Sequence, residues 1–372
     1  MRIGVPKETA PHERRVALVP ETVARLSKAG HELFIESGAG NEAGFPDSQF
    51  EEAGAKTVDH GTDAAASAEI FVHVQQPVTS EIDALEKGAV VIGLLNARTD
   101  PSIVTALAGV GVTALTMELV PRIARAQRLD VLSSQASVAG YKAALIAAGS
   151  IGKYFPMMMT AAGTIPPAKV LVLGAGVAGL QAIATARRLG AAVEAFDVRS
   201  AAAEQVQSLG AKFIQPPEAQ DAEAAGGYAR EQTEEEQQLQ REFLKDHIAA
   251  SDVVITTAAI PGRPAPRLVF SDMVSAMQPG SVIVDLAAET GGNCEVTKPG
   301  EVVVHDGVQV HGPFNVPSSM PYHASQLYSR NVAALFDLII GKEGRLNIDF
   351  DDEVIDAMCV AHAGQARQGL GE

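Results

Sequence analysis

Short apolar runs alternate with polar or amphipathic stretches along most of the chain. In the first 120 residues the apolar runs predict strands, and the stretches between them predict helices. The predicted strands are 2–5, 31–36, 70–75, 89–95 and 112–117, and the predicted helices are 21–29, 62–68, 80–87 and 101–107. Repeated alternation of this kind is typical of a parallel sheet with helices on both faces.

A second alternating series starts at residue 169. Its predicted strands are 169–173, 192–196, 211–215, 252–257, 281–286, 302–304 and 308–311, and its predicted helices are 180–189, 201–208, 237–250 and 271–277. Helices predicted at 323–340 and 352–360 would pack back on the first half. We therefore expect an α/β protein with two doubly wound parallel-sheet domains joined by long helices. These are a discontinuous, flavodoxin-like domain of residues 1–133 plus 318–372 and a Rossmann domain of residues 134–317.

Three glycines follow the predicted strand 169–173 with the spacing G-x-G-x-x-G. Gly174 would permit a tight turn, Gly176 would let a pyrophosphate approach the backbone, and Gly179 would let helix and strand pack closely. The start of the next helix would offer N–H groups to the phosphates. The sequence therefore predicts a dinucleotide site, and the alternative is a glycine-rich turn in an unrelated α/β protein.

Asp197 ends the second strand of this series. An acidic side chain at this place accepts hydrogen bonds from the adenosine ribose and would repel a 2′-phosphate, which favours NAD(H) over NADP(H). Arg199 weakens that preference, because a nearby arginine can accommodate the phosphate. We assign Asp197, Val198 and Arg199 to the cofactor site.

The composition narrows the classes of function. The net charge of −16 argues against nucleic acid and against direct binding to an anionic membrane surface. The two cysteines, Cys294 and Cys359, form no C-x-x-C pair, so we expect neither a disulfide framework nor a metal site. No apolar run reaches the ~18–20 residues of a membrane span, and the N-terminus does not resemble a signal peptide. We expect a soluble cytoplasmic protein.

The segment 121–135 is rich in polar side chains, with three arginines, an aspartate and two serines. It is consistent with a solvated helix start capped by Ser133 or Ser134, and equally with a functional loop. The helix after it is predicted to reach about residue 154 and to be long enough to join two domains. A second polar stretch, 216–236, has a length at which loops are usually functional or mobile.

Several of these motifs resemble the NAD(H)-binding component, domain I, of proton-translocating nicotinamide nucleotide transhydrogenase. The resemblance covers nearly the whole chain and is strongest at 117–135 (MELVPRIARAQRLDVLSSQ) and 156–181 (PMMMTAAGTIPPAKVLVLGAGVAGLQ), with further matches at 225–230, 256–266 and 285–294. Alanine dehydrogenase shares this architecture, and the opening MRIGVPKE and the stretch RVALVP also resemble it.

Two positions separate these families. Alanine dehydrogenases need a lysine and a histidine that bind and protonate the oxo-acid, and the matching residues here are Gln75 and Asn96. Neither can act as a general acid or base near neutral pH. His73, on the same strand face as Gln75, is interpreted as a half-buried strand histidine, and Arg15 alone would only position a carboxylate. Hydride transfer between two nicotinamides needs no such base, because the cofactors carry the chemistry.

The resemblance also implies roles for individual residues. Arg122 and Asp130 would fix the nicotinamide, Ser133 would contact its carboxamide, and Gln127 would bridge to the nicotinamide ribose and the partner's nucleotide. The family often has Ser-Met where this chain has Arg128-Leu129. Further implied contacts are Val177 and Ala178 beside the pyrophosphate, Ala259 beside the adenine, and Gly227 and Tyr228 in a mobile loop that closes over the nucleotide.

The function implied by the resemblance is that of the NAD(H)-binding subunit of a proton-translocating transhydrogenase. It would present NADH for direct hydride transfer to NADP+ on a partner subunit, with NADP(H) bound only by that partner. The resemblance also implies a homodimer at the cytoplasmic face of the membrane, attached through a membrane-spanning subunit. The alternatives are an alanine dehydrogenase-like amino-acid dehydrogenase and a non-catalytic NAD(H)-sensing module.

Overall fold

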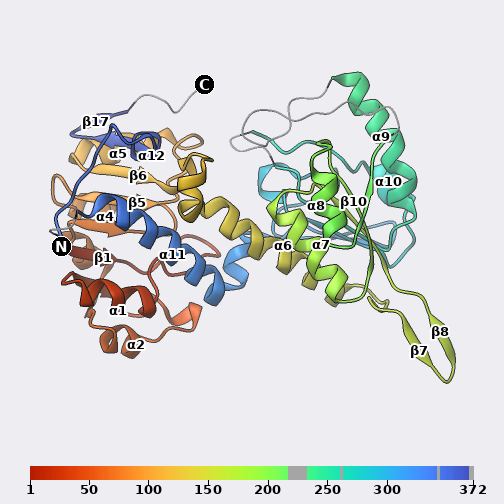
Figure 1. Cartoon of the computed structure of the whole chain (residues 1–372), viewed down its shortest axis with the longest axis horizontal. Coiled ribbons are helices and arrows are strands. Elements are labelled where there is room, and N and C mark those ends of the chain that lie inside the picture. Colours follow the sequence, from red (N-terminus) through yellow and green to blue (C-terminus); the bar gives the residue numbers. More distant parts are fainter. Residues whose placement is uncertain (217–232, 260–262, 342–343, 368–372) are drawn as a thin grey trace. The chain divides into compact units, whose positions relative to one another are not determined.

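The computed structural model describes residues 1–216, 233–259, 263–341 and 344–367 (Figure 1). The chain forms two compact units, Met1–Gln135 with Pro317–Glu372 and Ala136–Val316. It passes from the first unit to the second within helix α6 (Val131–Ser150) and returns within the 3-10 helix η6 (Val316–Ser319). Each unit has its own sheet and its own buried apolar clusters.

The sheet of the first unit has the order β17-β16-β6-β5-β4-β1-β2-β3 in the part of the chain that the structure describes. The strands from β6 to β3 are parallel to one another. Their central members are buried on both faces, which explains the continuous apolar runs in the sequence. The bounds are β1 Arg2–Val5, β2 Glu32–Glu36, β3 Lys56–Val58, β4 Ile70–Val72, β5 Val90–Gly93, β6 Thr113–Thr116, β16 Cys359–His362 and β17 Gln365–Ala366.

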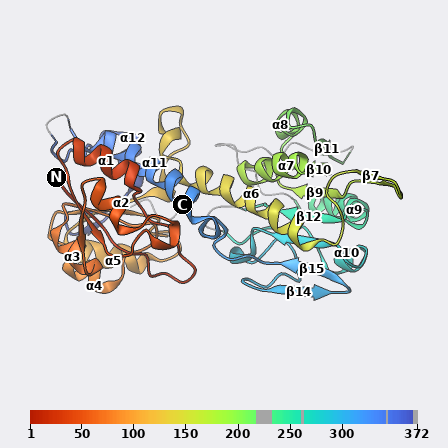
Figure 2. The ribbon, with the colours of Figure 1, turned by 90° about the horizontal axis from the view of Figure 1, so that it is seen from below.

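Helices cover both faces of this sheet (Figure 2). One buried cluster contains side chains from α1, α11 and α12, and the other contains side chains from α3, α4 and α5. The bounds are α1 Pro20–Lys28, α2 Asp47–Glu52, α3 Gly61–Ser67, α4 Thr79–Ala84, α5 Pro101–Val110, α11 Pro321–Ile339 and α12 Glu353–Met358. The doubly wound α/β architecture is thus confirmed for this unit.

Two details of the first unit differ from the sequence prediction. The short elements α2 and β3 were missed, and β3 extends the edge of the sheet, so the parallel strands run 3-2-1-4-5-6 and not in the flavodoxin-like order 2-1-3-4-5. In addition, the helix predicted at 352–360 ends at Met358. Residues Cys359–His362 form β16 instead, because they pair antiparallel with β6 and bury their apolar side chains there.

The sheet of the second unit has the order β11-β10-β9-β12-β13-β15-β14 and is parallel except for the edge strand β14. The strand order reverses between β9 and β12, as in Rossmann folds. Helices α6, α7 and α8 contribute to one buried cluster, and α9 and α10 contribute to another. The bounds are β9 Lys169–Leu173, β10 Ala192–Phe196, β11 Lys212–Ile214, β12 Val253–Thr256, β13 Val282–Asp285, β14 Val302–His305, β15 Val308–His311, α7 Val177–Arg188, α8 Ala202–Ser208, α9 Glu234–Ala249 and α10 Ser271–Ser275.

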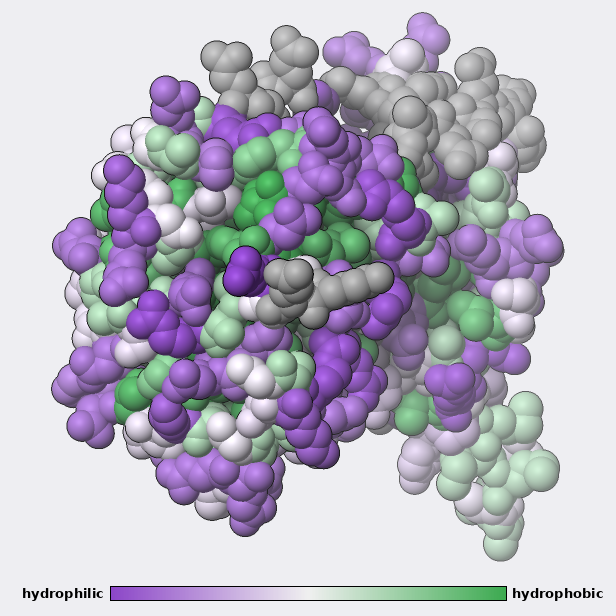
Figure 3. Space-filling view, turned by 60° about the vertical axis from the view of Figure 1, so that its left-hand side comes forward, coloured by the Kyte–Doolittle hydropathy of each residue, from purple (hydrophilic) through white to green (hydrophobic). Residues whose placement is uncertain are grey.

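A separate hairpin of β7 (Met158–Thr160) and β8 (Gly163–Ile165) projects from the second unit (Figure 1). The sequence analysis predicted no element here. Its apolar side chains are largely solvent-exposed, with 79% of Met159 and 43% of Ile165 accessible. In the space-filling view the hairpin is the pale green projection at the lower right (Figure 3).

A buried ionic cluster lies in the first unit, next to β4. His73 is fully buried, and its ring nitrogens lie 3.5 Å from Glu8 Oε1 and 3.3 Å from Glu81 Oε2. Burial alone would lower the pKa of His73, but the two carboxylates outweigh it and raise the pKa to about 9. His73 is therefore a cation in a structural cluster, and it is more buried than the sequence interpretation assumed.

This cluster predicts a pH-dependent stability. The folded-state pKa of His73 lies above the unfolded value, so its stabilising contribution is complete below about pH 6.5 and is lost as the pH rises through about 9. We expect His73→Gln to lower the free energy of unfolding at pH 7 by about 3 kcal/mol, because two buried carboxylates lose their cation. Urea unfolding between pH 6 and 10 measures both effects.

The matched control for this prediction is His311→Gln. Burial lowers the pKa of His311, so this residue is neutral throughout the alkaline range. The control should keep the decline in stability between pH 7 and 10, whereas His73→Gln should flatten it. An equally steep decline in His73→Gln would show that His73 is not the titrating group.

Candidate functional site

The glycine motif forms a very close crossing between β9 and α7. Gly174 has a φ of +100°, and a Cβ at this residue would lie 2.7 Å from Thr257 Oγ1. A Cβ on Gly179 would lie only 1.9 Å from the carbonyl oxygen of Gly174. At Gly176, in contrast, a Cβ would meet nothing within 4 Å. Two glycines are thus required by the fold itself, and the third faces open space.

The helix after the motif starts three residues earlier than predicted. It begins at Val177 with Gly176 as its N-cap, and no side chain caps it. The first-turn N–H groups of Val177, Ala178 and Gly179 therefore lie at an uncapped helix start that faces the open side of Gly176. Such a helix start suits a phosphate, because the orphan N–H groups and the helix dipole both favour an anion.

Asp197, just after β10, contacts both the glycine loop and Arg199. One carboxylate oxygen accepts a hydrogen bond from the Ala175 N–H at 2.7 Å. The other accepts from the backbone N–H and from Nε of Arg199, and Nη2 of Arg199 lies 2.8 Å from the first oxygen. The Asp197 side chain is only 6% exposed. Val198 between them is half-buried and packs against the core.

The end of β12 completes this edge of the sheet. Thr257 donates a hydrogen bond to the Gly174 carbonyl at 3.1 Å. The buried amide of Asn293 accepts from the Ala258 N–H and donates to the Ala258 carbonyl, at 3.0 and 2.8 Å. Ala259 follows and is exposed. Thr257 and Asn293 were missed by the sequence analysis, because no local motif marks them.

A further missed residue is Gly140 in α6. A Cβ here would lie 2.0 Å from the carbonyl oxygen of Ala178, so α6 packs directly against the first turn of α7. The signal was available as a glycine inside a predicted helix, which often marks close backbone packing. Two other predicted site residues, Gly227 and Tyr228, lie outside the described residues.

The polar segment 121–133 belongs to the first unit, where it forms the 3-10 helix η3 (Ala124–Leu129) before α6. Asp130 caps α6, because its carboxylate accepts from the backbone N–H of Ser133 at 2.9 Å and from the Ser133 hydroxyl at 2.6 Å. The cap is therefore Asp130, and the prediction of Ser133 or Ser134 was wrong. Asp130 and Ser133 are in contact, whereas Arg122 and Gln127 are exposed on the same segment.

Two helices of the same unit hold this segment in place. Arg125 forms a bidentate ion pair with Asp352 at 2.9 and 2.8 Å, which holds the pKa of that carboxyl below its usual range. Asn331 on α11 donates to the carbonyl of Arg128 at 2.8 Å and accepts from the Ser134 hydroxyl at 2.7 Å. The Arg128 side chain itself is 75% exposed. The segment is thus fixed at both ends of η3.

The neighbourhood of Arg15 is fully buried and internally paired. Its guanidinium binds Glu13 with Nε at 2.8 Å and Nη2 at 2.6 Å, and its Nη1 donates to Gln135 at 2.8 Å. The amide of Gln75 also donates to Glu13, at 2.8 Å. Asn96, the other position that separates the two families, is exposed and has a φ of +52°. The guanidinium that could hold a substrate carboxylate thus already holds a carboxylate of the chain.

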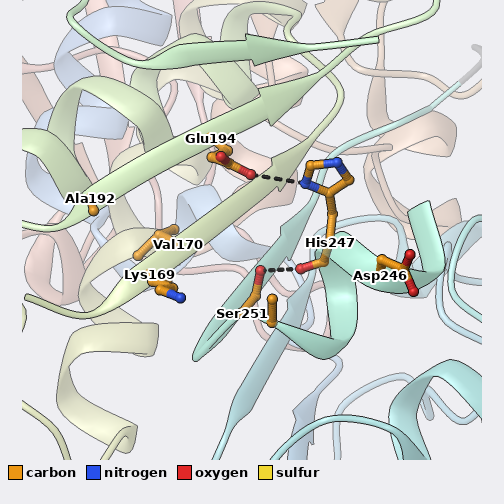
Figure 4. A pocket seen from close by; sticks show the side chains of 8 residues that line it. Lys169, Val170, Ala192, Glu194, Asp246, His247 and Ser251 are labelled. Atoms are coloured by element: carbon orange, nitrogen blue, oxygen red, sulfur yellow. Dashed lines mark hydrogen bonds and ion pairs between the residues drawn. The ribbon is translucent and has the colours of Figure 1, made fainter. Parts of the chain in front are cut away.

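A cavity of about 380 Å³ lies elsewhere in the second unit (Figure 4). Its lining includes Lys169 and Ala192, which begin β9 and β10, so it lies at the amino ends of these strands. Nucleotides bind at the carboxyl ends in such sheets. Burial opposes ionisation of Glu194, but hydrogen bonds from Lys212 and His247 outweigh it and lower the pKa of this carboxyl. We interpret this cavity as a structural crevice.

Comparison with known proteins finds relatives over nearly the whole chain. The family models "Alanine dehydrogenase/PNT, N-terminal domain" and "Alanine dehydrogenase/PNT, C-terminal domain" match residues 4–139 and 143–369. A Rhodospirillum rubrum protein, named as an NAD(P) transhydrogenase subunit alpha, is 46% identical over 98% of this chain and 97% of that protein. The "NAD(P) transhydrogenase subunit alpha" of Haemophilus influenzae is 45% identical over 98% of this chain and 71% of that protein.

Two solved structures are similar in both fold and length. The transhydrogenase from Sinorhizobium meliloti has a TM-score of 0.86 and 43% identity, and the match covers 98% of each chain. An L-alanine dehydrogenase has a TM-score of 0.82 and 27% identity, over 98% of this chain and 96% of that one. No helix in the described ranges is long and apolar enough to cross a membrane.

The glycine loop yields a matched pair of substitutions. We expect Gly179→Ala to lower the free energy of unfolding by about 1–3 kcal/mol, because its Cβ would overlap the Gly174 carbonyl. Gly176→Ala should cost less than about 1 kcal/mol, because its φ of −75° suits any residue and its Cβ meets no neighbour. Urea unfolding compares the two, and equal destabilisation would contradict the geometry.

Proposed function

The chain belongs to the alanine dehydrogenase/PNT family, and on this premise we propose that it is the NAD(H)-binding subunit of a proton-translocating transhydrogenase. In this proposal the subunit presents NADH so that a hydride passes directly to NADP+ held by a partner subunit. Proton translocation is assigned to a membrane-spanning subunit.

The observation that carries the proposal is the pairing around Arg15. An amino-acid dehydrogenase must bind the substrate carboxylate and move a proton at the oxo-acid carbon. Here the Arg15 guanidinium is held by Glu13, and Gln75 donates its amide to the same carboxylate. Neither Gln75 nor Asn96 can transfer a proton near neutral pH. Direct hydride transfer between two nicotinamides has no need of these groups.

The residues of this chain then act by binding and alignment. The uncapped start of α7 would receive the pyrophosphate, with Gly174, Gly176, Val177, Ala178 and Gly179 around it, and Asp197 would accept the adenosine ribose. Arg122, Gln127, Asp130 and Ser133 would align the nicotinamide. Alignment of two reacting groups can be worth roughly 7–11 kcal/mol, so loss of a positioning contact should mainly slow transfer.

Gln127 is the residue to test for alignment. Its exposed amide has no side-chain hydrogen bond within the described residues, and η3 is fixed on both sides of it by Arg125 and Asn331. A polar group held out to solvent on a fixed segment suits a contact that forms only with ligand or partner. Asn shortens this side chain by one methylene and keeps the amide.

We expect Gln127→Asn to slow hydride transfer on the order of 10²-fold, while the Kd for NADH changes by less than about threefold. The measurement is stopped-flow reduction of an NADP+ analogue after the chain is mixed with an NADP(H)-binding transhydrogenase subunit. Arg128→Gln, a substitution on the same segment at a side chain outside the proposed contacts, serves as the matched control. Equal losses in rate and affinity would contradict the alignment role.

The wild-type chain provides the test of the function itself. It should transfer hydride in the mixture and show no NADH oxidation with pyruvate and ammonium. Steady turnover with pyruvate and ammonium would identify an amino-acid dehydrogenase instead. NADH binding without any transfer to the NADP+ analogue would favour a sensing module.

We also propose that the chain forms a homodimer through the β7–β8 hairpin and works at the cytoplasmic face of the membrane through its partner subunits. Supporting this, Met157, Met159 and Ile165 expose apolar surface on a projecting hairpin, and such patches usually mark interaction sites. Methionine side chains adapt readily to a partner surface.

The hairpin predicts a change of oligomeric state. We expect Met159→Asp to convert the dimer to a monomer, because a carboxylate would be desolvated in an apolar interface. Met159→Leu should remain dimeric. Light scattering after size-exclusion chromatography distinguishes the two, and a dimeric Met159→Asp would exclude this surface.

A further inference from the structure

The carboxylate of Asp197 has every acceptor position filled by the chain itself. A carboxylate has about four lone-pair positions. One oxygen of Asp197 takes the N–H of Ala175 and Nη2 of Arg199, and the other takes the backbone N–H and Nε of Arg199. All four distances lie between 2.7 and 2.9 Å. A further hydrogen bond to this carboxylate therefore requires that one of these donors leave.

The four donors are not equally able to leave. The N–H groups of Ala175 and Arg199 belong to the backbone of the glycine loop and of the turn after β10, so they fix the carboxylate in place. The other two belong to the Arg199 guanidinium, at the end of a long side chain that is 21% exposed. The guanidinium can rotate away without any change in the backbone.

A vicinal diol and a guanidinium make similar demands on a carboxylate. The guanidinium presents two parallel N–H donors, one to each oxygen, and the ribose diol presents two O–H donors with comparable spacing. We propose that Arg199 is an internal competitor of the adenosine ribose, and that it must leave Asp197 before the ribose can bind there. This inference rests on the proposed function in so far as the ligand is NAD(H).

The competition gives Arg199 a role in specificity. A ligand that must displace the guanidinium binds more weakly by the fraction of time for which the carboxylate is accessible. A 2′-phosphate is repelled by Asp197 and attracted by Arg199, so it gains from the arginine that the diol must displace. Arg199 should therefore weaken NADH binding and strengthen NADPH binding. An arginine that simply bound the nucleotide would strengthen both.

Arg199→Ala tests the inference in the full chain, with binding of NADH and NADPH measured by isothermal titration calorimetry. We expect NADH to bind more tightly, on the order of tenfold, and NADPH to bind more weakly. The matched control is Arg188→Ala, which removes an exposed arginine of the last turn of α7 and should leave both affinities unchanged. Thermal unfolding verifies that each variant is folded.

Unchanged or weaker NADH binding in a folded Arg199→Ala variant would overturn the inference and leave the proposed function intact. A wild-type chain that binds no NADH would overturn both. If Arg199→Ala fails to fold, Arg199→Lys decides, because lysine keeps the charge but cannot form the two-pronged contact. Tighter NADH binding by Arg199→Lys supports the competition, and unchanged or weaker binding overturns it.

Discussion

The close crossing of α7 over the glycine loop is the constraint on which the second unit depends. Because Gly179 lies against the carbonyl of Gly174, the helix starts directly beside the carboxyl end of β9. The same approach brings the Ala175 N–H to Asp197 and the Gly174 carbonyl to Thr257, so the ends of β10 and β12 are tied to one loop. A single added methyl group at Gly179 would separate these contacts.

The first unit uses a related architecture for a different purpose. Its polar side chains are paired with one another in the interior, as in the contacts of Arg15 with Glu13 and of His73 with Glu8 and Glu81. Buried charges must be paired, so these residues are committed to the structure. The residues that remain available, Arg122 and Gln127 among them, lie on a short segment that α11 and α12 hold in place. This division supports a subunit that aligns a cofactor and performs no proton transfer of its own.

Much of this organisation could be predicted from the sequence, and the rest could not for identifiable reasons. Long apolar runs and the glycine spacing predicted the α/β fold, because both are local patterns. Short elements with polar residues, such as α2 and β3, carry too weak a pattern, and β16 forms only because β6 offers an edge. The partners of Arg15, Asp197 and Ser133 depend on tertiary contacts, as does the close approach at Gly140, so the sequence could name the residues but not their pairing.

The most direct test of the account follows the hydride itself. NADH that carries deuterium at both C4 positions is mixed with the chain and an NADP(H)-binding transhydrogenase subunit loaded with NADP+, and the reduced product is analysed by mass spectrometry. Direct transfer predicts one deuterium in every NADPH formed, with none lost to solvent. NADPH that contains solvent hydrogen at C4 would contradict the account, because it would require an intermediate acid or base that we do not find in the described part of the chain.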